Sequence, residues 1–135
     1  RAGFHVGVLA YKNEELLAWL SIGPLIDFYW TWKRAIHVGE EAKSIAGITC
    51  FTLAPKFRGQ GMQSKILESL KLYGKSQNWT RIEAYPFDDS TLEKQKEHAI
   101  WPGITKGFKD AGFTYISPHW INGPGWERSI YKADL

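Results

Sequence analysis

Residues 56–65, KFRGQGMQSK, place two glycines among basic side chains directly before a helical pattern. The first N–H groups of a helix have no partner inside the helix, and the helix dipole gives them partial positive charge. Glycine lets a ligand approach the backbone closely and adopts positive φ, while Lys56 and Arg58 add full charges. The segment therefore has the chemistry of an anion site, best suited to a phosphate or diphosphate.

Several interpretations of these glycines compete. A Walker loop requires a lysine directly after its last glycine, and Met62 follows Gly61 instead. A dinucleotide-binding fingerprint requires a third glycine where Ser64 stands, and it follows the first strand of a parallel sheet, whereas a hairpin pattern comes first here. A purely structural turn between a strand and a helix also stays open, with no ligand involved.

The elements around the glycines are predicted by their hydrophobic patterns. Residues 45–54 form a nearly continuous apolar, β-branched run that is typical of a strand buried on both faces, and Pro55 closes it. The residues after the glycine segment, from Met62 on, predict an amphipathic helix of about four turns, which ends near residues 74–78. Its apolar stripe consists of Met62, Ile66, Leu70 and Tyr73, with Leu67 beside it. Residues 81–87 predict the second strand of a right-handed parallel crossover.

The remaining elements complete one mixed sheet with helices on it, an α/β (α+β) domain over residues 1–135. An antiparallel hairpin is predicted from strands at 4–11 and 16–23, and Pro24 ends its regular pairing. Further expectations are a short helix at about 28–36, an exposed loop at 88–100, a helix at about 102–111 capped by Gly112, and strands at 113–117 and 127–133.

Composition narrows the class of protein. Hydrophobic residues make up 44% of the chain, which allows a packed core and argues against disorder. The net charge of +3 is spread along the chain without a dense basic run, so we expect no nucleic-acid partner. The single cysteine, Cys50, excludes an internal disulfide and a cysteine-based zinc site, and it favours a reducing, cytoplasmic setting. No apolar run reaches the ~20 residues of a membrane span.

Residues 58–63, RGQGMQ, resemble the acyl-CoA loop of the GCN5-related N-acetyltransferases, usually written [RQ]-x-x-G-x-[GA]. Gln63 stands where that family prefers glycine or alanine. The hairpin, the strand ending in LAPKFRGQG, the helix beginning MQSKILESL, the strand RIEAYP and the DAGF at 110–113 also follow the family's order. Family members usually open with a strand and two helices that this chain does not contain, so we expect a fragment or a partner that replaces them.

The resemblance implies acetyl-CoA as co-substrate and a small molecule or peptide with a primary amine as acceptor; a homodimer is left open. No metal and no membrane are expected. The loop backbone would bind the diphosphate of coenzyme A, and the preceding strand would pair with pantetheine between two strands that splay apart. The implied cofactor-binding residues are Phe51, Thr52, Leu53, Lys56, Arg58, Gly59, Gln60, Gly61, Met62, Gln63 and Ser64.

Catalytic candidates follow from the chemistry of amine acetylation. The amine must lose a proton, since an alkylammonium has a pKa of about 10, and a carboxylate is a suitable acceptor. Glu83 is the candidate base because a carboxylate in the middle of an apolar strand is costly unless it is paired or functional. The alternatives are a structural ion pair with Arg81 or a lysine, or a sheet-edge position near solvent. Tyr85 is the substitute acid, because Phe108 stands where many family members carry a tyrosine. A CoA-binding module without turnover remains the alternative function.

Overall fold

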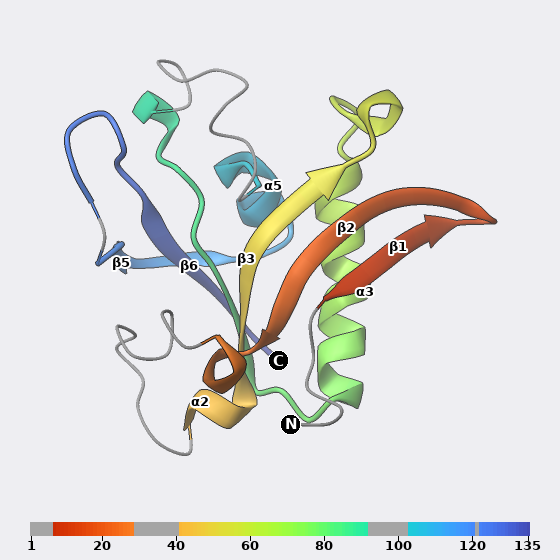
Figure 1. The fold of residues 1–135 in the computed structure, drawn as a ribbon, viewed down its shortest axis with the longest axis horizontal. Helices are drawn as coiled ribbons and strands as arrows, with labels where there is room; N and C mark the ends of the chain where they lie inside the picture. The colour runs from red at the N-terminus through yellow and green to blue at the C-terminus, as the bar shows by residue number, and fades with distance from the viewer. Residues whose placement is uncertain (1–6, 29–40, 92–102, 121) are drawn as a thin grey trace.

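The computed structural model describes residues 7–28, 41–91, 103–120 and 122–135. The described residues form one six-stranded sheet with helices on its two faces (Figure 1). Across the sheet the strands are β1 (Val8–Lys12), β2 (Glu15–Pro24), β3 (Ile45–Leu53), β4 (Arg81–Ala84), β6 (Ser129–Asp134) and β5 (Thr114–Pro118). The helical elements are η1 (Leu25–Asp27), α2 (Glu41–Ser44), η2 (Pro55–Phe57), α3 (Met62–Ser76) and α5 (Thr105–Asp110).

The sheet is mostly antiparallel, as the sequence predicts, with one parallel pair at its centre among the described strands. That pair is β3 and β4, joined by α3 as the crossover helix. The first hairpin turns at Asn13, whose φ of 53° lies in the left-handed region that asparagine tolerates. Pro24 is the last paired residue of β2, opposite Ala46, so the pairing ends where the proline predicts.

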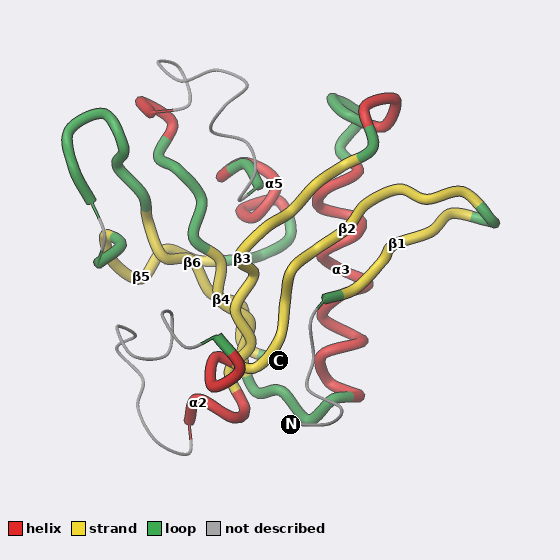
Figure 2. The backbone as a smooth tube through the Cα atoms, in the orientation of Figure 1, coloured by secondary structure: helices red, strands yellow, loops and turns green. Residues whose placement is uncertain are grey.

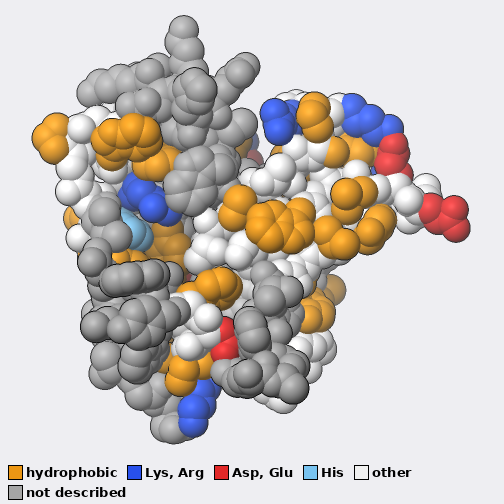
Figure 3. All heavy atoms as spheres, viewed as in Figure 1, with side chains coloured by type: hydrophobic (Ala, Val, Ile, Leu, Met, Phe, Trp, Pro, Cys, Tyr) orange, Lys and Arg blue, Asp and Glu red, His pale blue; other side chains and the backbone are white. Residues whose placement is uncertain are grey.

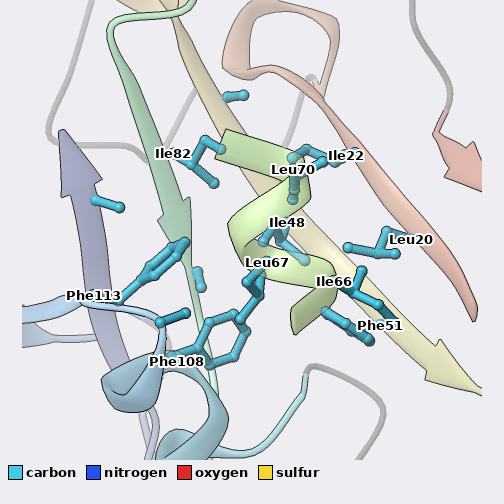
Figure 4. Packing of buried hydrophobic residues seen from close by; sticks show 14 of the residues in the cluster. Leu20, Ile22, Ile48, Phe51, Ile66, Leu67, Leu70, Ile82, Phe108 and Phe113 are labelled. Carbon is cyan, nitrogen blue, oxygen red and sulfur yellow. The ribbon is translucent and has the colours of Figure 1, made fainter. Parts of the chain in front are cut away.

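Helix α3 covers one face of the sheet, and the main core lies between the helix and that face. Ile66, Leu67 and Leu70 are at most 7% exposed and point from α3 toward side chains of β2 and β3 (Figure 4). Their partners in this cluster include Leu20, Ile22, Ile48 and Phe51. The helical stripe predicted from the sequence is therefore the buried face of α3. Phe108 of α5 and Phe113 close the same core with ring centroids 5.3 Å apart.

The opposite face of the sheet has a smaller apolar cluster. Ile45 of β3 packs there with Leu25 of η1 and Ala42 of α2, whereas its neighbour Ala46 joins the main core. This alternation follows from the period of two in a strand. It also places Gly47 on the face away from α3. The two faces of β3 and β4 are therefore chemically distinct, and the polar side chains of interest lie opposite α3.

Several predicted boundaries differ from the structure. The strand expected at 81–87 ends at Ala84, because the chain then turns toward residues 127–129: the Asp88 N–H donates to the Glu127 carbonyl and the Ser129 N–H donates to the Pro86 carbonyl. The helix expected from 102 begins at Thr105, because Gly103 has φ 85° and Ile104 is extended.

The other differences are smaller. The first two strands are β1 and β2 as bounded above, and residues 4–6 of the first predicted strand lie outside the described residues. The last two strands are 114–118 and 129–134. Residues 29–36 of the helix expected at 28–36 and residues 92–100 of the loop expected at 88–100 lie outside the described residues. Residues 89–91 of that loop are helical and Thr91 is buried, so this part is not an exposed loop. None of the helices in the described part of the chain has the length and apolarity needed to cross a lipid bilayer.

Candidate acyl-CoA site

The glycine segment forms an exposed loop between β3 and α3. Gly59 and Gly61 have φ values of 72° and 70°, a left-handed conformation that side chains disfavour. A Cβ atom added at either glycine would meet no protein atom within 4 Å. The outer surface of this turn is therefore open, and the turn is not filled by the protein's own side chains.

The loop also presents backbone N–H groups. Within the described residues, the N–H groups of Gly59, Gln60 and Gly61 form no hydrogen bond. Gly61 is the N-cap of α3 and provides no capping side chain. The first turn of α3 consequently keeps the free donors and positive end of the dipole that the sequence predicts. This is the local geometry of an anion site at a helix N-terminus.

The side chain of Gln63 points away from this surface. The side chain is 6% exposed, and its amide group forms two hydrogen bonds with the backbone of Ile104. Nε2 donates to the Ile104 carbonyl at 3.0 Å, and Oε1 accepts from the Ile104 N–H at 3.1 Å. The glutamine therefore does not cover the backbone that the shorter residues of the family pattern leave open.

The polar side chains of the loop mostly hold the loop itself. Gln60 Nε2 donates to the Lys56 carbonyl at 2.7 Å, and Ser64 Oγ donates to the Gly61 carbonyl at 3.0 Å. The ammonium group of Lys56 forms an ion pair with Glu15 on the β1–β2 hairpin. The charge of Lys56 is thus shared with a carboxylate, and Arg58 supplies the cation on the loop itself; its Nε donates to the Leu53 carbonyl at 3.2 Å. Met62 is half-buried against the core.

Next to this loop, β3 and the chain after β4 separate. The two strands pair only from Ile45–Arg81 to Ile48–Ala84. Beyond that point β3 stays with β2 as far as Leu53, whereas the chain after β4 turns to the β6 side (Figure 2). The splay predicted from the family resemblance is therefore present in the backbone.

Both sides of the splay have a visible cause. On β3, the β2 pairing passes from Ile22–Ile48 to Ser21–Cys50, so Thr49 is an extra, bulged residue; bulges bend a strand and increase its twist. On the other side, Arg128 donates from Nε and Nη2 to the Tyr85 carbonyl at 3.0 and 2.8 Å. Sequence reasoning missed Arg128, because nothing in the local pattern shows that its side chain reaches residue 85.

The end of β3 directs backbone groups toward the splay that β4 does not pair. The Ala54 N–H donates to the Leu17 carbonyl of β2 at 2.8 Å, and hydrogen bonding alternates along an antiparallel pair. Cys50 and Thr52 therefore direct their backbone groups to β2. Phe51 and Leu53 direct theirs to the opposite edge, which β4 does not pair. Of the three predicted strand contacts, Phe51 and Leu53 have the backbone geometry to pair with an extended ligand.

Glu83 and Tyr85 lie together on the face of the sheet away from α3. The Tyr85 hydroxyl donates to Glu83 Oε2 at 3.1 Å, and Arg81 Nη1 lies 3.9 Å from Oε1. The Glu83 side chain is 3% exposed, and its Cα partner on β3 is Gly47. A Cβ at Gly47 would lie 3.1 Å from the Tyr85 hydroxyl, so the glycine leaves room for this pair. The carboxylate sits one residue pair below the point where the strands separate.

Burial sets the protonation of Tyr85. Desolvation raises the pKa of its hydroxyl well above the usual value of 10.0; the adjacent Glu83 carboxylate raises it further, and Arg128 opposes this. Tyr85 therefore keeps its proton at neutral pH and holds it toward Glu83. Burial of Arg128 in turn lowers the pKa of its guanidinium to about 10, which leaves it charged at neutral pH.

Aromatic side chains surround Tyr85. The rings of His119 and Trp120 stack on each other at 4.0 Å, and both meet the Tyr85 ring edge-on at 5.5 Å. The indole N–H of Trp120 is buried and has no hydrogen-bond acceptor among the described residues. Figure 3 shows a histidine and basic side chains beside apolar ones on this flank of the molecule. Trp101, His5, His37 and His98 lie outside the described residues.

Two further residues bear on the chemistry. Phe108, at the position where the family often has tyrosine, has no hydroxyl to donate a proton; it is 0% exposed and belongs to the main core. Cys50 is a free, half-buried thiol whose Sγ lies 3.6 Å from Thr52 Oγ1. In the part of the chain that the structure describes, no three metal-ligating side chains gather.

Comparison with solved structures places this arrangement in a known fold. AAC(6')-Ib, solved with paromomycin and acetyl-CoA, aligns with a TM-score of 0.61 and 15% identity over 93% of this chain. The ribosomal-protein-alanine N-acetyltransferase of Brucella melitensis gives 0.59 and 13% over 94%. The GNAT domain of S. lividans PAT gives 0.60 and 17% over 96%.

This chain has the GCN5-related N-acetyltransferase fold. It spans 62%, 67% and 60% of the length of those three solved chains. No protein-family model and no curated protein sequence matches it. Within this fold, the open loop before α3 and the parting of β3 from β4 are the features that the sequence predicts for an acyl-CoA site.

Proposed function

We propose that this protein is an N-acetyltransferase that moves an acetyl group from acetyl-CoA directly to a primary amine. The amine nitrogen attacks the thioester carbonyl, a C–N bond forms, and the C–S bond breaks to release the CoA thiolate. One proton leaves the amine and one is taken up by the thiolate, so the reaction balances without a protein nucleophile. The observation that carries the proposal is the open, uncapped N-terminus of α3 beside the splayed strands.

Binding of coenzyme A is assigned to the loop and to the end of β3. The diphosphate would accept hydrogen bonds from the N–H groups of Gly59, Gln60 and Gly61 and from the first turn of α3. Pantetheine would pair with the backbone edge of β3 at Phe51 and Leu53, which β4 leaves unpaired. Arg58 contributes the nearby positive charge, and Lys56, Met62, Gln63 and Ser64 keep the loop in place. Thr52 would contact coenzyme A through its exposed side chain, because its backbone N–H is directed to β2.

Proton transfer is assigned to Glu83 and Tyr85. Glu83 would accept the amine proton, directly or through a water molecule that it positions. Tyr85 is protonated at neutral pH and can donate a hydrogen bond to the departing thiolate, while its raised pKa makes full transfer of its proton less favourable. A free backbone N–H at the end of β3 would stabilise the oxyanion. The thiolate is also a tolerable leaving group unaided, since a thiol pKa is near ~8.5.

The acceptor is assigned only as a small molecule or peptide that bears a primary amine. Support comes from the solved proteins of the same fold, which include one crystallised with the aminoglycoside kanamycin and one named for ribosomal-protein alanine. We place the reaction in the cytoplasm because a single free thiol suits a reducing compartment.

A thiol-release assay tests the activity. Acetyl-CoA is incubated with a panel of amines, including amino acids, polyamines, aminoglycosides and peptide N-termini, and free CoA thiol is measured with a disulfide reagent. Amine-dependent release, with the acetylated product seen by mass spectrometry, is the expected result. The absence of release with every amine, together with no binding of acetyl-CoA at millimolar concentration, would refute the proposal.

A CoA-binding module without turnover is the second candidate. It is favoured by the replacement of a tyrosine by the fully buried Phe108 and by the enclosed, already paired carboxylate of Glu83. The same assay separates the two candidates. Tight binding of acetyl-CoA without thiol release above the rate for Glu83→Gln would support the module.

A further inference from the structure

The side chain of Gln63 joins two elements that lie far apart in the sequence. Gln63 is the second residue of α3, directly after the glycine loop. Both of its amide atoms bond to the backbone of Ile104, the N-cap residue of α5, which has no capping side chain of its own. A backbone N–H and a backbone carbonyl, 41 residues away, are thus satisfied by one buried amide.

Two glycines make room for this amide. A Cβ atom at Gly107 would lie only 2.5 Å from Gln63 Cδ and 2.7 Å from Nε2. A Cβ atom at Gly103 would lie 3.2 Å from Nε2, and the φ of 85° there also favours glycine. A larger residue at 107 would push the Gln63 side chain out of its place, and one at 103 would first meet the Phe108 ring at 2.9 Å and then Gln63 Nε2. Gln63, Gly103, Gly107 and the Ile104 backbone therefore form one matched contact, which we call the amide lock.

We propose that Gln63 is a positioning residue: through the amide lock it fixes the first turn of α3, and hence the direction of the loop N–H groups that bind the diphosphate of coenzyme A. The inference rests on the proposed function. The physical reason is that Gly61, the N-cap of α3, has no side chain, so no cap hydrogen bond fixes the first turn. The buried hydrogen bonds of the Gln63 side chain anchor that turn to α5, while the backbone N–H groups of the glycine loop on its outer side remain free.

The test compares substrates with and without the diphosphate. The first variant is Gln63→Leu, which keeps the volume of the side chain but removes both of its hydrogen bonds to Ile104. The second is Gly107→Ala, which displaces the side-chain amide of Gln63 without changing its chemistry. Gln77→Ala, an exposed glutamine after the last turn of α3, is the matched control. Acetyl-CoA and acetyl-pantetheine are the two donors, and kcat and KM are measured for each. Calorimetry with CoA and thermal unfolding accompany the kinetics.

The expected result is selective. Misplacing the loop N–H groups should weaken their hydrogen bonds to the diphosphate and raise the KM for acetyl-CoA by about tenfold, which corresponds to about 1.4 kcal/mol of binding free energy. The kcat with acetyl-CoA and the kcat/KM with acetyl-pantetheine should stay within about twofold of wild type. In a Gln63→Ala background, Gly107→Ala should cost no further stability, because the space beside residue 107 is then empty.

Other outcomes overturn the inference. An unchanged KM for acetyl-CoA in both variants would show that the lock does not act on the diphosphate site. An equal loss with both donors would show a general structural defect instead of positioning. Failure of the wild-type protein to bind CoA by calorimetry would refute the proposed function itself, and the inference with it, whereas wild-type binding with unaffected variants refutes the inference alone.

Discussion

At the scale of single residues, the pair Glu83–Tyr85 carries the proposed chemistry. The carboxylate is enclosed, it accepts the tyrosine hydroxyl, and Arg81 lies near it. Such a group can be a structural ion pair or a base that a substrate reaches from the splay. The two roles differ in what happens when the charge is removed and the shape is kept.

Glu83→Gln separates these roles. The amide oxygen can still accept the Tyr85 hydroxyl, so the fold should survive, but the residue can no longer take a proton. We expect kcat to fall by about 100-fold or more, as for loss of a general base, with the KM for acetyl-CoA within about twofold. Thiol release under saturating acetyl-CoA measures this. A kcat within twofold of wild type would remove Glu83 from the mechanism, and Glu68→Gln on the exposed side of α3 is the control.

Tyr85 makes a prediction for alkaline pH. Because its pKa is raised in the folded state, the stabilisation that this shift reflects is complete below pH 10 and is lost as the pH rises above 10, where only the unfolded chain ionises. Between pH 9 and 11 the free energy of unfolding of wild type should fall more than that of Tyr85→Phe, by on the order of 1 kcal/mol. Urea unfolding at the two pH values measures this, and parallel curves for the two proteins would contradict it.

At the scale of elements, α3 holds both the core and the loop. Leu67 is 0% exposed and Leu72 is 69% exposed on the same helix, so the two leucines form a matched pair for testing. Leu67→Ala should lower the free energy of unfolding by about 2–5 kcal/mol, whereas Leu72→Ala should change it by less than about 0.5 kcal/mol. Equal effects in urea unfolding would show that α3 does not pack on the sheet in this orientation.

Arg128 ties the chain after β4 to the β6 side of the splay. Its two hydrogen bonds reach the Tyr85 carbonyl, and its guanidinium lies 5.1 Å from the Phe87 ring centroid. Arg128→Met should destabilise the fold by about 2–3 kcal/mol, since it leaves that carbonyl without this charged donor. Arg128→Lys should restore only part of the loss, because lysine lacks the two-pronged donor geometry. An effect no larger than that of the exposed Lys109→Met would contradict this account.

At the scale of the whole molecule, the sequence predicted the parts that depend on local patterns. The apolar stripe from Ile66 to Leu70 and the apolar run of β3 are visible in the local sequence, so the parallel crossover and its buried helix face could be predicted. The ends of the elements were harder to predict. Strand β4 stops at Ala84 because residues 86 and 88 form backbone hydrogen bonds with a segment some 40 residues later, and no local sequence pattern indicates this.

In the candidate site, too, some features could be predicted from the local sequence and others depend on tertiary contacts. The open backbone at Gly59 and Gly61 was predictable because glycine and a following helix dictate it. The direction of the Gln63 side chain was not, because its partner Ile104 and the glycines that make room for it lie in another element. Arg128 and the bulge at Thr49, which shape the splay, likewise depend on tertiary contacts.

Calorimetry of coenzyme A binding tests the central claim most directly: free backbone N–H groups at the start of α3 bind its diphosphate. Gly61→Ala adds a Cβ atom to the open surface, and at a φ of 70° it should cost the fold only about 1–2 kcal/mol. Wild type should bind CoA with micromolar affinity and pantetheine far more weakly. Gly61→Ala should bind CoA at least tenfold more weakly while its affinity for pantetheine stays unchanged. Equal affinity of wild type and Gly61→Ala for CoA, or no CoA binding by wild type, would contradict the account.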